Sequence, residues 1–148
     1  MIKKCIYPAI LVMVIAFAFF GCSDEEKSDG REISKGIYTI DQSGYSIVLA
    51  GYSFDANKTD AWIEEASSLL SDEISEDTYG PLYGLASIES AKLLDGTLSV
   101  CLSREYLEIS GVRETLIRSA IAKTYLQHED ITSVAFYIGD DLLTDSLG

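Results

Sequence analysis

The chain has 148 residues, with 24 acidic and 11 basic side chains, and its net charge at neutral pH is −13. This length suits a single folded domain. Such a negative field repels nucleic acid and anionic lipid headgroups, so the composition argues against nucleic-acid binding and against membrane attachment through a basic patch.

The first residues are typical of a secretory signal. Lys3 and Lys4 precede a long apolar run that ends at Cys22. As a helix, the apolar core of residues 6–20 would span about 22 Å, short of the ~30 Å hydrocarbon core of a bilayer. We therefore expect a cleaved signal peptide over residues 1–21, with an uncleaved membrane anchor as the alternative.

The end of this segment, Phe19-Phe20-Gly21-Cys22, resembles the lipobox of bacterial lipoproteins. In that family the cysteine thiol receives a diacylglyceryl group, and cleavage makes the cysteine the new N-terminus. The resemblance implies lipid attachment at Cys22, cleavage between Gly21 and Cys22, and an extracytoplasmic location on the membrane. Two acyl chains anchor a protein stably without a basic patch, which suits an acidic chain.

Residues 22–36 are rich in Ser, Asp, Glu, Lys and Gly, and predict an acidic, flexible tether. Cleavage would remove two of the 11 basic residues and none of the 24 acidic ones, leaving a net charge near −15. Because Cys5 would be removed and Cys22 modified, Cys101 would have no partner for an intramolecular disulfide.

The folded part is expected to begin with a β-hairpin. Residues 37–40 form its first strand, Asp41 to Gly44 supply turn chemistry, and residues 45–52 form its second strand. One face of the second strand should carry Tyr45, Ile47 and Leu49.

A helix over residues 61–74 follows, with Asp60 as its expected cap. Its apolar stripe consists of Trp62, Ile63, Ala66, Leu69 and Leu70. Residues 75–85 contain Gly80, Pro81 and Gly84 and are predicted to be a loop.

Two further strands and a helix are predicted in the second half of the domain. Residues 88–94 and 97–102 flank Asp95-Gly96, a strong signal for a two-residue hairpin turn. The side chains expected on the inner face of the second strand are Leu98, Val100 and Leu102.

Ser110 is then positioned to cap a helix that runs to about Gln127. Its predicted stripe consists of Val112, Leu116, Ile117, Ala120, Ile121 and Thr124. Glu114 and Arg118 should form an exposed ion pair one turn apart. A last strand over residues 132–138 directs Val134, Phe136 and Ile138 inward.

The resulting order, β-β-α-β-β-α-β, predicts an α+β fold: a mixed sheet with both helices packed on one face. The domain would cover residues 37–141, and residues 142–148 would form a polar C-terminal tail.

Three segments of this domain resemble the sporulation and spore-germination domain called GerMN. They are the strand–turn–strand run from Leu94 to Ser103 with Glu105-Tyr106-Leu107, the helix end Ile121-Ala122-Lys123-Thr124-Tyr125-Leu126, and the strand from Val134 to Gly139. The resemblance implies a non-enzymatic role in assembly at the cell envelope, in sporulation or germination, by self-association or by binding a protein partner.

Candidate catalytic groups are sparse, and the sequence predicts neither an enzyme nor a cofactor. His128, beside Glu129 and Asp130, could serve as a base, but a histidine at a helix C-terminus is commonly structural. Cys101 could act as a nucleophile or form an intermolecular disulfide, although it lies within a predicted strand and is more simply a small strand residue.

The remaining candidates are surface features. The carboxylate pairs Glu64-Glu65, Asp72-Glu73 and Glu76-Asp77 lack the spacing of a calcium loop, so no metal site is expected. Tyr79 and Tyr83 in the predicted Gly-Pro loop are a candidate contact surface for a protein or a glycan.

Two functional hypotheses follow. The first is a lipid-anchored, non-catalytic interaction or assembly module of the cell envelope. The second is a lipoprotein that binds a small ligand or glycan for a transporter or a cell-wall enzyme, which requires a concave site lined by tyrosines. A hydrolase is a distant third, because no nucleophile and base can be assembled from the sequence.

Overall fold

The computed structural model describes residues 35–55 and 58–144. The predicted signal peptide, Cys22 and nearly all of the predicted tether lie outside the described residues. Within the described ranges, no helix is long and apolar enough to cross a membrane.

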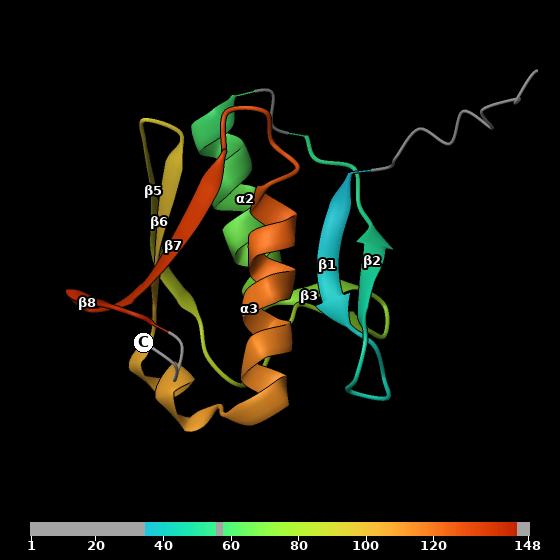
Figure 1. Cartoon of the computed structure of the whole chain (residues 1–148). Helices are drawn as coiled ribbons and strands as arrows, with labels where there is room; N and C mark the ends of the chain where they lie inside the picture. Colours follow the sequence, from blue (N-terminus) through green and yellow to red (C-terminus); the bar gives the residue numbers. More distant parts are fainter. Residues whose placement is uncertain (1–34, 56–57, 145–148) are drawn as a thin grey trace, which may run out of the picture. The chain divides into compact units, whose positions relative to one another are not determined.

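A four-stranded mixed sheet forms one layer of the domain (Figure 1). β5 (Ile88–Leu94) and β6 (Thr97–Leu102) are antiparallel, β6 and β7 (Ser133–Ile138) are parallel, and β8 (Asp141–Leu142) is antiparallel to β7. Asp95 and Gly96 turn the β5–β6 hairpin with φ of 48° and 79°, the left-handed conformation that such two-residue turns require. β8 spans the predicted start of the C-terminal tail at residue 142.

The two α-helices of the described residues pack on one face of this sheet. α2 (Thr59–Ser71) lies along β5, and α3 (Gly111–Tyr125), preceded by the 3-10 helix η1 (Arg104–Glu108), connects the parallel strands β6 and β7. The helices cover three side chains of β6 that are completely buried: Leu98, Val100 and Leu102. The predicted fold class, α+β with a mixed sheet and two helices on one face, is confirmed.

The N-terminal hairpin is a separate layer. β1 (Gly36–Ile40) pairs only with β2 (Ile47–Gly51) among the described strands, and the helices lie between this hairpin and the four-stranded sheet (Figure 1). The Tyr38 amide donates to Thr124 Oγ1 at 2.9 Å and the Gly36 amide donates to Gln127 Oε1 at 3.1 Å, which fixes β1 on α3.

The second strand of this hairpin begins later than predicted. Tyr45 belongs to the turn rather than to the strand and is 79% exposed, and Leu49 is also exposed. The prediction that Tyr45 shares a strand face with Ile47 and Leu49 is therefore wrong, because β2 begins at Ile47. β1 is the strand of this hairpin that packs closely on the helices.

α2 starts and ends earlier than predicted. Lys58 is the residue at the N-cap, and Asp60 lies inside the first turn, so the expected Asp60 cap is wrong. The helix ends at Ser71 because the chain folds back onto its last turn: the Leu82 amide donates to Leu70 O at 3.0 Å, and the Gly80 amide donates to Asp72 O at 2.8 Å.

Part of the predicted loop at residues 75–85 is a small antiparallel hairpin. β3 (Glu73–Ser75) pairs with β4 (Thr78–Tyr79) across a turn in which Asp77 has a φ of 61°. Aspartate is one of the few residues with a side chain that tolerates this conformation, so the turn forms without a glycine.

α3 buries most of its predicted stripe, with Val112 as the exception: Ala120 and Thr124 are completely buried and Leu116 is partly buried. Ile117, Ile121 and Tyr125 are completely buried, whereas Val112 is 67% exposed. Val112 precedes Ile117 by five residues, or about 140° around the helix, so it falls outside the buried stripe. Ser110 occupies the N-cap as predicted, but its side chain makes no capping hydrogen bond.

Candidate binding groove at the stacked tyrosines

Tyr79 and Tyr83 form an exposed aromatic pair. Tyr79 ends β4, and Tyr83 lies in the turn after Pro81. Their rings stack with centroids 4.4 Å apart and an interplanar angle of 24°, while the two residues remain 40% and 48% exposed. The structure thus brings together the two tyrosines that the sequence predicts as a contact surface.

The backbone between the two tyrosines is fixed against the end of α2. Gly80 lies so close to the helix that a Cβ at this position would overlap the carbonyl oxygens of Leu69 and Leu70. Leu82 is completely buried, and the amides of Gly80 and Leu82 both bond to carbonyls at the end of α2. The aromatic pair therefore stands on an ordered support rather than on a free loop.

A groove extends from this pair between three parts of the fold. Its volume is about 820 Å³. It is lined by the β1–β2 turn, by Val48 of β2, by the segment from Asp77 to Leu85, and by Val112 and Arg113 of α3. Thr39 Oγ1 donates to Tyr79 O at 2.6 Å and connects the hairpin wall to the tyrosine wall.

The hairpin wall is ordered by Asp41. One carboxylate oxygen of Asp41 accepts the amides of Tyr45 (3.2 Å) and Ser46 (3.1 Å), and the Ser43 hydroxyl donates to the same carboxylate at 2.7 Å. These bonds favour the charged form, so the pKa of Asp41 is lowered, with the Ser43 hydroxyl as the main cause. The turn holds Tyr45 at the rim of the groove.

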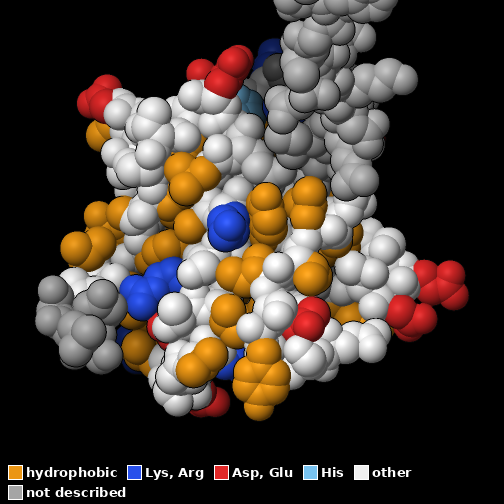
Figure 2. Space-filling view, turned by 45° about the vertical axis from the view of Figure 1, so that its right-hand side comes forward, with side chains coloured by type: hydrophobic (Ala, Val, Ile, Leu, Met, Phe, Trp, Pro, Cys, Tyr) orange, Lys and Arg blue, Asp and Glu red, His pale blue; other side chains and the backbone are white. Residues whose placement is uncertain are grey.

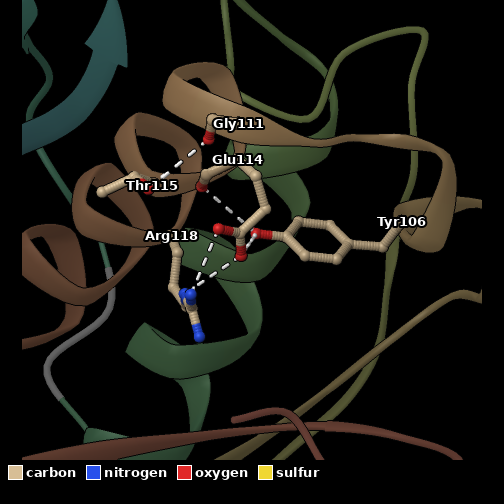
Figure 3. A network of polar contacts seen from close by, with 5 residues as sticks. All are labelled: Tyr106, Gly111, Glu114, Thr115 and Arg118. Atoms are coloured by element: carbon tan, nitrogen blue, oxygen red, sulfur yellow. Dashed lines mark hydrogen bonds and ion pairs between the residues drawn. The ribbon is translucent and has the colours of Figure 1, made fainter. Parts of the chain in front are cut away.

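Next to the groove residues of α3, Glu114 and Arg118 join a polar network that lies outside the groove (Figure 3). The hydroxyl of the fully buried Tyr106 donates to Glu114 Oε1 at 3.1 Å, and Arg118 Nε and Nη2 each lie 3.1 Å from a carboxylate oxygen of Glu114. The predicted Glu114–Arg118 pair is confirmed, although it is half-buried rather than exposed. Burial is the main cause that raises the pKa of Tyr106, so this phenol stays protonated.

The groove concentrates apolar surface. Ten large hydrophobic residues are exposed in the described part of the chain, and five of them line this groove: Tyr45, Val48, Tyr79, Tyr83 and Val112. Figure 2, which brings the β1–β2 side of the molecule forward, shows many hydrophobic side chains on that face and few charged ones. Clustered apolar exposure of this kind marks binding surfaces.

The polar groups of the groove are suited to binding. The Arg113 guanidinium is a hydrogen-bond donor on the α3 wall. Asp41 provides a carboxylate on the hairpin wall, and Asp77 provides one on the tyrosine wall. The pKa of Tyr79 is raised, mainly by the charge of Glu73, so its hydroxyl remains a neutral hydrogen-bond donor. The groove offers aromatic faces, donors and acceptors for a ligand surface.

His128 and Cys101 lie elsewhere. The His128 ring packs on Trp62 with centroids 4.9 Å apart, and its Nδ1 accepts the Asp130 amide at 3.3 Å, which supports the structural interpretation. Cys101 Sγ lies 3.8 Å from Glu89 Oε2 and 3.7 Å from Gly139 O on the outer face of β6. No cluster of three His, Cys, Asp or Glu side chains in the described ranges is placed to hold a metal ion.

Sequence reasoning missed the other three exposed apolar residues of the groove, Tyr45, Val48 and Val112, and its basic residue Arg113. The sequence predicts Tyr45 within the second strand of the hairpin and Val112 in the apolar stripe of the second helix. Only the turn residues before Tyr45 hinted at its exposure, and no local signal places Val112 near residues some 30 to 70 positions earlier in the chain.

No protein-family model matches the chain, and no curated protein or solved structure has a significant match to it.

Proposed function

We propose that this chain is a lipid-anchored protein of the cell envelope whose domain is a non-catalytic interaction module that docks a protein partner in the tyrosine groove. The observation that carries the proposal is the stacked Tyr79–Tyr83 pair, exposed within a groove that gathers half of the large hydrophobic residues exposed in residues 35–55 and 58–144. Tyrosine contributes large contact area at low entropic cost and is enriched where proteins bind each other.

The uncovered parts of the fold agree with an interaction module. The helices cover one face of the four-stranded sheet, and within the described residues nothing covers the other face. The resemblance of the sequence to GerMN domains supports the same class of function, in sporulation or germination. The lipobox-like residues before Cys22 support the anchor.

A site-specific crosslink tests the groove. A photoreactive amino acid at position 83, in cells, should give a discrete adduct with one envelope protein, and Tyr79→Ala should reduce its yield. The same probe at Leu126 is the matched control, because this residue is 47% exposed and lies outside the groove. Equal adducts from positions 83 and 126 would contradict a specific docking site.

A second candidate is a small ligand or a glycan, favoured by the concavity of the groove and its three tyrosines. Its volume of about 820 Å³ lies within the range of small-molecule sites, which is about 300–1,000 Å³. Soluble cell-wall fragments should then quench tyrosine fluorescence in the native chain and not in a Tyr79→Ala/Tyr83→Ala variant. Saturable quenching without any protein adduct would favour this candidate over the protein partner.

The anchor is tested separately. Cells that express the chain are fed a fatty-acid probe, and labelling of the native chain is compared with that of Cys22→Ser. We expect the label to be lost in the variant. Equal labelling of both chains would reject lipid attachment at Cys22.

A further inference from the structure

One edge of the four-stranded sheet is unpaired. β5 is seven residues long and pairs with β6 on one side, and among the described residues no strand pairs with its other side. The opposite edge carries the two-residue β8. An unpaired edge strand presents backbone N–H and C=O groups that can pair with another extended chain.

The hairpin turn determines which backbone groups of β5 face outward. In a two-residue hairpin the flanking residues, here Leu94 and Thr97, exchange backbone hydrogen bonds, and bonded and non-bonded pairs then alternate along the strands. The pairing is regular from Leu94 back to Ser90. The amides and carbonyls of Ala91 and Leu93 therefore point away from β6, toward the free edge.

A groove follows this edge, with α2 as its second wall. Its volume is about 860 Å³, and it shares no lining residue with the tyrosine groove. The seven residues of β5 span about 23 Å and the 13 residues of α2 span about 20 Å. Each wall is therefore long enough to contact an extended peptide of six to seven residues along its whole length. Extended peptides can bind by adding a strand to an exposed sheet edge, and this groove lies along such an edge.

The charge of the walls selects the occupant. Asp60, Glu64 and Asp72 of the helix side and Glu89 of β5 line the groove against a single basic residue, Lys92. In the described part of the chain, none of the three helix-side carboxylates is paired with a basic side chain. This field attracts a cationic segment. It repels the acidic residues of the predicted tether and a second copy of a chain with a net charge of −13.

We propose that the β5–α2 groove binds an extended segment of a partner protein in which Lys or Arg residues alternate with small ones, and that this segment adds to β5 as a fifth strand. Alternate side chains of an added strand point to the same face. The basic side chains therefore face Asp60 and Glu64 on α2, while the backbone bonds to Ala91 and Leu93. This site is independent of the tyrosine groove, so either could exist without the other.

Backbone methylation of a peptide probe tests the strand addition. The probe is a fluorescent heptapeptide of alternating Lys and Thr, and its anisotropy is measured during titration with the full chain in non-ionic detergent. Only every second amide of an added strand bonds to its neighbour. N-methylation of one alternate set of amides should abolish binding, and methylation of the other set should leave binding nearly unchanged. Equal effects of the two methylated sets would overturn the proposal.

Charge variants test the groove as the location. Asp60→Asn/Glu64→Gln should weaken binding of the unmethylated probe about three- to ten-fold, the range expected for two exposed charge pairs. Glu76→Gln/Glu108→Gln, which removes two exposed carboxylates outside the groove, should leave the affinity unchanged. An equal loss in both double variants would show unspecific attraction to the acidic surface and overturn the proposal.

Two other occupants are outcomes of the same experiment. A dimer that light scattering detects without peptide, and that the probe dissociates, would assign β5 to a second copy of the chain. A gain of affinity on deleting residues 23–34 would assign the groove to the tether. Either result would overturn the proposal.

Discussion

Gly80 connects the stability of the fold to the candidate site, and Gly80→Ala is the sharpest test of that connection. The added Cβ would overlap Leu69 O and Leu70 O and lie 2.5 Å from the Leu70 carbonyl carbon, all of them backbone atoms of α2. Relief requires the segment from Tyr79 to Tyr83 to move away from the helix. Overpacking of this kind costs about 1–3 kcal/mol, and loss of the Gly80–Asp72 hydrogen bond costs about 0.5–1.5 kcal/mol more. We expect the free energy of unfolding to fall by about 2–4 kcal/mol.

Urea unfolding followed by far-UV circular dichroism measures this loss, and the near-UV signal of the tyrosines reports the separation of the stacked pair. Gly51→Ala is the matched control, because no heavy atom lies within 4 Å of its Cβ position and its φ is not in the left-handed region. Its free energy of unfolding should change by less than about 0.5 kcal/mol. A Gly80→Ala chain as stable as the control, with an unchanged tyrosine signal, would refute the close approach as the support of the site.

Two further predictions concern pH. Burial raises the pKa of Tyr106 and Tyr125, so above pH 10 the unfolded chain loses phenolic protons that the folded chain retains. The free energy of unfolding should then fall by about 1.4 kcal/mol per pH unit for each phenol. In urea titrations at several pH values, Tyr106→Phe or Tyr125→Phe should reduce this dependence on pH. An unchanged dependence would contradict the raised pKa of the substituted tyrosine. The pKa of Asp41 is lowered, so its charged carboxylate stabilises the β1–β2 turn at every pH above the ordinary carboxyl pKa. This stabilisation is lost as the pH falls further and the carboxylate becomes protonated. Hydrogen-exchange protection at Tyr45 and Ser46 should fall on acidification, and Asp41→Asn should lack this dependence; an identical dependence in the variant would count against the Asp41 bonds.

Elements whose signals are local could be predicted from the sequence. Asp95-Gly96 specifies its own turn, and the flanking strands were predicted with the bounds that the structure has, 88–94 and 97–102. The alternation of Leu98, Val100 and Leu102 likewise identified the inner face of β6. In each case residues within a few positions of each other carry the necessary information.

The wrong predictions concern features that depend on residues far apart in the sequence. The end of α2 depends on amides of Gly80 and Leu82, which take the carbonyls that another helical turn would have used. The stripe of α3 was misjudged at Val112 because the positions of β1 and the sheet, not the hydrophobicity of one residue, determine which side is buried.

The residues of the tyrosine groove likewise include some that the sequence predicts and some that it does not. Tyr79 and Tyr83 are four residues apart around a Gly-Pro pair, so their proximity could be predicted from the sequence. Tyr45 and Val112 reach the groove only through the packing of β1 and α3. The second groove, at β5, depends on the strand order, which neither composition nor periodicity specifies.

The attachment of β1 to α3 has a consequence for the order of folding during synthesis. The bonds from Gly36 to Gln127 and from Tyr38 to Thr124 join residues separated by 91 and 86 positions, so β1 cannot complete its docking until α3 and the residues just after it have formed. The two-stranded hairpin alone is marginally stable. We expect the segment from β5 to β7 to form first and the N-terminal hairpin to dock last. A nascent chain arrested before residue 124 should therefore leave β1 and β2 open to proteases.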